Sequence, residues 1–74
     1  MTEDFTRTLG LRVKTLRTQQ GYTQDRLCAK LQLLGCDFTR SALAKVEVGQ
    51  RRLYPEELRA LKQALQISYE DLLE

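Results

Sequence analysis

The chain has 74 residues and carries 12 Lys and Arg against 10 Asp and Glu, two Cys, and no His, Asn or Trp, for a formal charge of +2. This length fits one small domain and leaves little stability for a deep substrate pocket. Two Cys without His argue against a zinc site or a disulfide framework. The short apolar runs and the acidic start argue against a membrane span or a signal peptide, so we expect a soluble cytoplasmic protein.

The composition favours an all-α fold. Leu occurs fourteen times, aliphatic β-branched residues are few, and no alternation of apolar and polar residues lasts long enough for a strand. We therefore predict five helices with short connections. The first is expected over about residues 4–20 and should end at Gly21. Its apolar face would consist of Phe5, Leu9, Val13 and Leu16.

A pattern that recurs four times predicts the other helices. An apolar residue precedes a possible N-cap, and a Leu follows four positions after that cap, which is the spacing of the hydrophobic staple. The helices should start near residues 24, 40, 55 and 69, and the caps would be Thr23, Thr39, Tyr54 and Ser68. Tyr54 is a poor cap, but Pro55 suits the first helical position. Ser68 with Asp71 resembles a capping box.

The inner faces of the second to fourth helices are expected to be rich in Leu. Glycines should end the second helix at Gly35 and the third at Gly49. The expected inward residues are Leu27, Leu31 and Leu34 in the second helix, Leu43 and Val46 in the third, and Leu58, Leu61 and Leu65 in the fourth.

The third helix presents two different faces at 100° per residue. The inward face consists of Ala42, Leu43 and Val46. The outward face carries Arg40, Ser41, Ala44 and Lys45. Long donors beside a small residue would let this face enter a DNA major groove and donate to guanine O6 and N7. A solvated helix surface has the same pattern, so both interpretations stand on the helical wheel alone.

The small net charge hides an uneven distribution. Residues 5–54 hold ten basic and three acidic side chains, a net +7, whereas residues 55–74 hold two basic and five acidic ones, a net −3. This asymmetry is typical of a protein that binds a polyanion. Chance clustering of surface charge is the alternative.

The order and spacing of these motifs resemble a known family. The stretch Leu9–Leu73 is similar to the Cro/repressor-type (Xre-like) helix-turn-helix domains of bacterial and phage transcriptional regulators. The matching pieces are Leu16-Arg17, Gly21, Thr23-Gln24, Leu27, Thr39-Arg40-Ser41, Val46-Glu47, Gly49, Glu57-Leu58, Ala64-Leu65 and Leu72-Leu73. The resemblance implies a compact, five-helix, lambda-repressor-like DNA-binding domain over residues 1–74, with the helix-turn-helix in helices two and three.

The resemblance also implies roles for individual residues. The positions that would face base edges are Arg40, Ser41, Ala44 and Lys45. The positions that would bind DNA phosphates are Gln24, Thr39, Arg51 and Arg52. Gln24 would also brace the recognition helix. Arg17 and Glu47 match a structural pair that ties the first helix to the end of the third. No residue is expected to be catalytic or to bind a metal or a cofactor.

Two departures from the family pattern stand out. Cys28 replaces a common Ala. The segment 32–38 is about one helical turn longer than in the shortest family members, and this length affects the direction in which Arg40 would point. Cys28 and Cys36 are interpreted as buried or half-buried thiols rather than as a redox or metal switch.

The leading interpretation is a sequence-specific, double-stranded DNA-binding regulator, a repressor that binds a palindromic operator as a homodimer, with no membrane or small-molecule partner. Leu53, Tyr69 and Leu73 are the candidate dimer contacts. The main alternative is a protein-interaction module of the same fold, such as an antitoxin or anti-repressor. A small enzyme is the third possibility, which the absence of His and of a carboxylate pair in a cleft argues against.

Overall fold

The computed structural model describes residues 3–73, so residues 1, 2 and 74 of the predicted domain lie outside the described range. This part of the chain forms five helices and no strand: α1 (Glu3–Gln19), α2 (Gln24–Leu33), α3 (Arg40–Glu47), α4 (Pro55–Leu65) and α5 (Tyr69–Leu73). The predicted all-α, five-helix fold is confirmed, and so are the four predicted helix starts. None of the described helices is both long and apolar enough to cross a membrane.

Side chains cap the helices at the predicted positions. Thr23 accepts a hydrogen bond from the Arg26 N–H at 3.1 Å, and Thr39 accepts one from the Ala42 N–H at the same distance. Ser68 and Asp71 exchange reciprocal bonds of 3.0 and 3.2 Å, as a capping box does. Each bond satisfies a backbone N–H that has no partner inside the helix.

The start of α4 is arranged differently, because its N-cap residue Tyr54 makes no side-chain cap bond. Instead, the Glu57 carboxylate reaches back and accepts a hydrogen bond from the Tyr54 backbone N–H at 2.8 Å. The end of α4 is also unusual, since Gln66 adopts a left-handed conformation with φ 54°. Glycine normally takes that conformation. Because no glycine stands at this position, the sequence did not predict where α4 ends.

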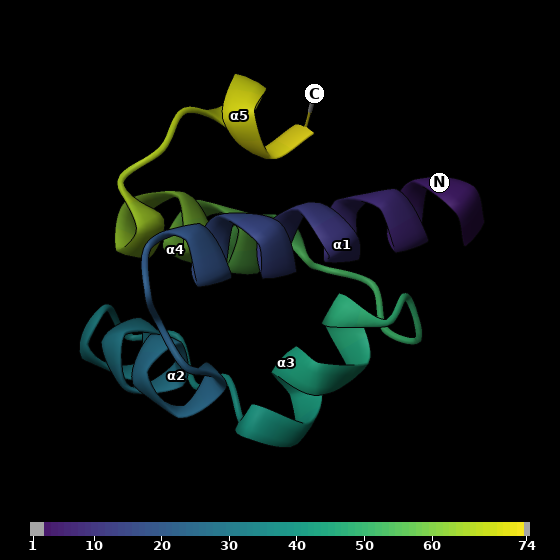
Figure 1. Ribbon diagram of the computed structural model, residues 1–74. Helices are drawn as coiled ribbons and strands as arrows, with labels where there is room; N and C mark the ends of the chain where they lie inside the picture. The colour runs from purple at the N-terminus through teal and green to yellow at the C-terminus, as the bar shows by residue number, and fades with distance from the viewer. Residues whose placement is uncertain (1–2, 74) are drawn as a thin grey trace.

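α1 is the central element. Figure 1 shows α3 on one side of α1 and the short α5 on the opposite side, with α4 running behind. Apolar side chains from all five helices and two loops meet in one core, which consists of Leu9, Val13, Leu27, Leu31, Phe38, Leu43, Val46, Leu53, Ala60, Leu61, Ala64, Leu65 and Leu72.

Three predicted placements are wrong. Phe5 is 37% exposed, because the first turn of α1 lies at the edge of the molecule (Figure 1). Leu34 is 45% exposed, because α2 ends at Leu33 and the next residue no longer follows the helical face. Leu53 is only 6% exposed and belongs to the core, so it cannot be a dimer contact as proposed.

Gly10 allows α1 and α3 to approach unusually closely. A Cβ atom at this position would lie 1.8 Å from the Val46 carbonyl oxygen and 2.9 Å from its carbonyl carbon. Since any larger residue would push the two helix backbones apart, Gly10 sets the depth at which α3 sits against α1.

Candidate nucleic-acid interface

The outward face of α3 has the composition that the helical wheel predicts. Arg40, Ser41 and Lys45 are exposed and Ala44 is half-buried, while Leu43 and Val46 on the other side are buried. The exposed side chains are two cations and a hydroxyl around a methyl group. This face can donate hydrogen bonds to an acceptor surface that approaches within side-chain reach.

Arg40 lies beside a carboxylate in the free protein. Its Nη1 lies 3.7 Å from a carboxylate oxygen of Asp25 in the first turn of α2, and both side chains are about two-thirds exposed. An exposed pair of this kind contributes less than about 1 kcal/mol. The Arg40 guanidinium is therefore free to exchange Asp25 for a stronger acceptor.

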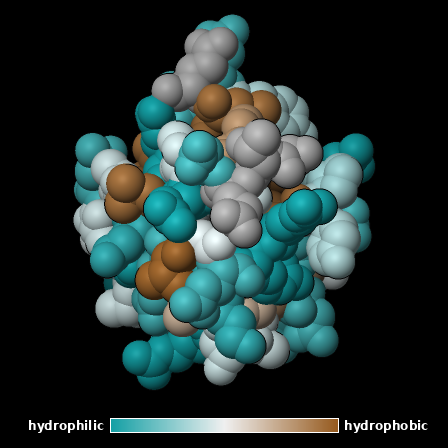
Figure 2. All heavy atoms as spheres, turned by 90° about the vertical axis from the view of Figure 1, so that its right-hand side faces the viewer, coloured by the Kyte–Doolittle hydropathy of each residue, from teal (hydrophilic) through white to brown (hydrophobic). Residues whose placement is uncertain are grey.

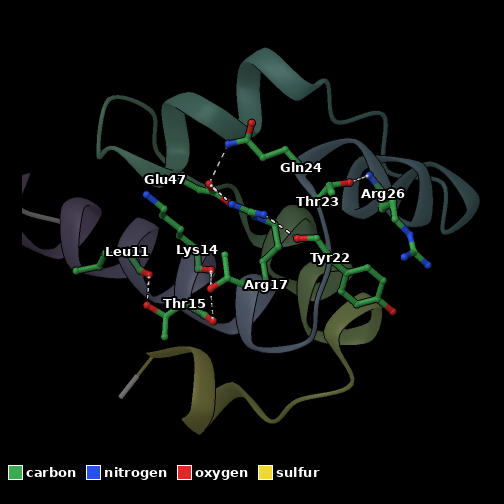
Figure 3. A network of polar contacts seen from close by, with 10 residues as sticks. Leu11, Lys14, Thr15, Arg17, Tyr22, Thr23, Gln24, Arg26 and Glu47 are labelled. Carbon is green, nitrogen blue, oxygen red and sulfur yellow. Dashed lines mark hydrogen bonds and ion pairs between the residues drawn. The ribbon is translucent and has the colours of Figure 1, made fainter.

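A buried ion pair fixes the C-terminal end of α3 to α1 (Figure 3). The Arg17 guanidinium donates to both Glu47 carboxylate oxygens, at 2.6 and 3.0 Å, and the side chains are only 9% and 2% exposed. Arg17 also donates to the Tyr22 carbonyl at 2.7 Å. The structure thus joins the two residues that the family resemblance pairs, in the bidentate geometry that arginine and carboxylate favour.

Gln24 joins the same network from α2. Its Nε2 donates to a Glu47 carboxylate oxygen at 3.0 Å (Figure 3). Glu47 of α3 is therefore held by α1 and α2 at once, so that one carboxylate connects three helices. The side-chain oxygen of Gln24, at the first position of α2, is not used in this bond.

The two arginines after α3 differ from each other. Arg51 is half-buried and donates two hydrogen bonds of 2.9 Å to the Glu57 carboxylate and one of 2.9 Å to the Arg52 carbonyl. Its guanidinium also lies 4.9 Å from the centre of the Phe38 ring and 5.8 Å from that of Tyr54. Arg52 is exposed. The family resemblance assigns both arginines to DNA phosphates. In the structure, however, their surroundings differ.

Glu57 was not among the predicted site residues. In the structure it is only 9% exposed and lies beside Arg51. Burial alone raises the pKa of its carboxyl group, but the hydrogen bonds from Arg51 and from the Tyr54 N–H outweigh burial and lower it. The hydrogen bond to Glu57 in turn raises the pKa of Arg51. The available sequence signal was a carboxylate three positions after a helix cap.

A surface hollow of about 210 Å³ lies beside these arginines. Thr6 of α1 and the loop residues Gly49, Gln50, Arg51 and Arg52 line it. Figure 2 faces the side of the molecule where α1 begins and the loop after α3 turns, and its hydrophobic residues form small patches separated by hydrophilic ones. This side is polar rather than a continuous apolar docking surface.

The uneven charge of the sequence is also uneven in space. The acidic residues Glu70 and Asp71 belong to α5, which lies across α1 from α3 (Figure 1). Arg40, Lys45 and Arg52 belong to α3 and the loop that follows it. An approaching polyanion would thus meet the cations of α3 without meeting the carboxylates of α5.

The cysteines take no part in this face. Cys28 and Cys36 are free thiols of intermediate burial, which confirms their interpretation as half-buried thiols. Burial raises the pKa of both, and nearby carboxylates, led by Asp25 for Cys28 and Glu57 for Cys36, raise it further. Within residues 3–73, no group of three potential metal-ligating side chains comes together.

A family model described as a helix-turn-helix domain matches residues 8–74, which include all of α2 to α5 and most of α1. Searches of curated proteins and of solved structures found no match to this chain.

Proposed function

The chain belongs to the helix-turn-helix domain family, and on this premise we propose that it is a sequence-specific, double-stranded DNA-binding transcriptional regulator of the Cro/repressor (Xre-like) type. One observation carries the proposal. The outward face of α3 is cationic and exposed, while the buried pair Arg17–Glu47 and the amide of Gln24 hold its C-terminal end rigidly. Pre-organised donors lose little side-chain and backbone freedom on binding.

In this proposal α3 enters the major groove, which is wide enough for one helix. Arg40 and Lys45 donate to guanine O6 and N7, Ser41 bonds a base edge, and the small Ala44 permits close approach to the bases. The phosphate ligands would be Gln24, Thr39, Arg52 and the remaining donor capacity of Arg51. Phosphate contacts fix the register of the protein on the duplex, whereas base contacts supply the specificity.

The protein is further proposed to bind as a homodimer to a palindromic operator, with residues 1–74 as its DNA-binding domain. Of the three expected dimer contacts, Tyr69 and Leu73 on α5 are 43% and 44% exposed and remain candidates. Both lie across α1 from α3 (Figure 1), so partner and DNA would use different surfaces. The assignment as a repressor rests on the family resemblance, and the cytoplasmic location stays an expectation from the sequence.

The salt dependence of binding tests the electrostatic part of this proposal. About four neutralised phosphates per subunit give a slope of log K against log salt near −7 for a dimer. Fluorescence anisotropy with a labelled random-sequence duplex measures it. A slope shallower than about −2 would contradict DNA binding and favour the protein-interaction module.

Matched variants sharpen the same measurement. Arg52→Gln removes one exposed charge beside α3 and should make the slope shallower by about 1 per subunit. Lys62→Gln removes one charge beside Tyr69 on the α5 side, where its ammonium lies 5.3 Å from that ring, and should leave the slope unchanged. Equal effects of the two variants would contradict the proposed orientation on DNA.

A further inference from the structure

A connecting segment leads from α2 into the N-terminal end of α3. Residues 34–39 join α2 to α3. The first part of this segment is tied back to α2, because the N–H groups of Gly35 and Cys36 donate to the carbonyls of Gln32 and Leu31 at 3.0 and 2.9 Å. Those bonds fix where the segment leaves α2. They do not determine the position at which α3 begins.

Phe38 anchors the segment directly before α3. It is 5% exposed, belongs to the core, and immediately precedes Thr39, the residue that caps α3. The Arg51 guanidinium lies 4.9 Å from its ring centre, which is the distance of a cation–π contact. Since Arg40 follows Thr39 directly, a displacement of Phe38 displaces the base of the Arg40 side chain.

Arg51 is itself held in place by α4. Its two bonds to the Glu57 carboxylate and one to the Arg52 carbonyl occupy the guanidinium in a fixed plane. Glu57 is fixed in turn by the bond from the Tyr54 N–H at the start of α4. We call the set Phe38, Arg51, Tyr54 and Glu57 the Arg51 clamp. It connects the α2–α3 segment, the loop after α3, and the start of α4.

We propose that the Arg51 clamp is the positioning device for the N-terminal end of the recognition helix, and that Arg51 and Glu57 therefore determine which DNA sequence Arg40 selects without reading a base themselves. α3 is then held at both ends by an arginine–glutamate pair, Arg17–Glu47 at its end and Arg51–Glu57 at its start. This inference rests on the proposed DNA-binding function, and it changes Arg51 from a sequence-neutral phosphate ligand into a specificity-determining residue.

The test uses two variants in which the new side chain is similar in size to the original, with one control for each. Arg51→Lys keeps the charge but loses the planar, bidentate contact, and Glu57→Gln removes the charge of the acceptor. The controls are Arg59→Lys and Glu56→Gln, which change exposed residues of α4 in the same chemical way. All proteins are measured at a temperature where circular dichroism shows them fully folded.

The decisive readout is the ratio of the affinities for a selected site and for its scrambled sequence. Both clamp variants should lower this ratio about tenfold and change the affinity for scrambled DNA less than about twofold, and the controls should change neither. A purely structural role would lower the unfolding temperature of the variants and leave the ratio of the two affinities unchanged. An unchanged ratio for Glu57→Gln, a residue of α4 that is almost fully buried, would overturn the proposal.

Amide hydrogen exchange separates failure of the clamp from failure of the proposed function. The clamp variants should speed exchange at Ala42 and Leu43, whose N–H groups bond to Thr39, at least fivefold over the controls. Unchanged exchange there would overturn the clamp even in a protein that binds DNA. A wild-type protein that discriminates no sequence would refute the DNA-reading function, while the exchange result would still report whether the clamp holds α3.

Discussion

Replacing Gly10 by alanine tests whether direct contact between backbones sets the position of α3. The added Cβ would lie 1.8 Å from the Val46 carbonyl oxygen, and real contacts of this kind are at least 3.0 Å, so α1 and α3 must separate by about 1.2 Å at this point. No rotamer change relieves the clash, because Cβ and the carbonyl oxygen are both fixed by the backbone. The adjacent residue Glu47 carries the buried pair with Arg17, which the same displacement stretches.

Two opposing terms set the magnitude. Gly→Ala inside a helix stabilises by about 1 kcal/mol, whereas overpacking a core costs about 1–3 kcal/mol and sometimes more. The clash at Gly10 belongs at the upper end of that range, and the strained Arg17–Glu47 pair adds to it. We expect a net loss of about 2–3 kcal/mol in the free energy of unfolding, or roughly 10–20 °C in Tm for a domain of this size.

Urea and thermal unfolding, followed by circular dichroism, measure this loss. Thr8→Ala is the matched control, since it changes an exposed position of the same helix turn and should alter stability by no more than about 0.5 kcal/mol. If Gly10→Ala proved as stable as the wild type, or more stable as helix propensity alone dictates, the close approach of α1 and α3 would be refuted.

Three further predictions concern buried and titrating groups. Glu47→Gln should cost about 3–5 kcal/mol, because it leaves the Arg17 charge buried without a counter-ion; a loss below about 1 kcal/mol in urea unfolding would contradict the buried pair. The Glu57 pKa is lowered from 4.5, so its contribution to stability is complete above about pH 4.5 and disappears as the pH falls through its lower folded value. The wild type should therefore lose more stability on acidification than Glu57→Gln. Parallel curves of the free energy of unfolding against pH for the two proteins would be evidence against this. Cys28 and Cys36 have raised pKa values, so both should react with a thiol reagent at about pH 7.5 several-fold more slowly than in urea; equal rates would contradict their packing.

The helix starts were predictable because their signals are local. Thr23, Thr39 and Ser68 are capping residues whose hydrogen bonds reach only three positions along the chain. Inward faces followed from the helical period, and this worked wherever the helix continued and another element covered it. It failed at Phe5, because periodicity does not give the extent of the core, and at Leu34, because the helix has already ended there.

The tertiary contacts of the site were less accessible. The Arg17–Glu47 pair, 30 residues apart, came from the family resemblance and not from spacing. Nothing local distinguished Arg51 from its neighbour Arg52, because the difference depends on Phe38 and Glu57 meeting Arg51 in space. Gly10 was missed for the same reason, since its role appears only when another helix lies against it.

The most direct test of the account is selection from random duplexes with the purified protein and with Arg40→Ala. The wild type should enrich a palindrome whose half-site centres lie about 10 bp apart, or a multiple of that spacing. Arg40→Ala should lose preference at one base position per half-site, with a loss of about 1–3 kcal/mol on the cognate site. Enrichment of no motif by the wild type, or of the same motif to the same degree by Arg40→Ala, would contradict the claim that the exposed face of α3 reads DNA.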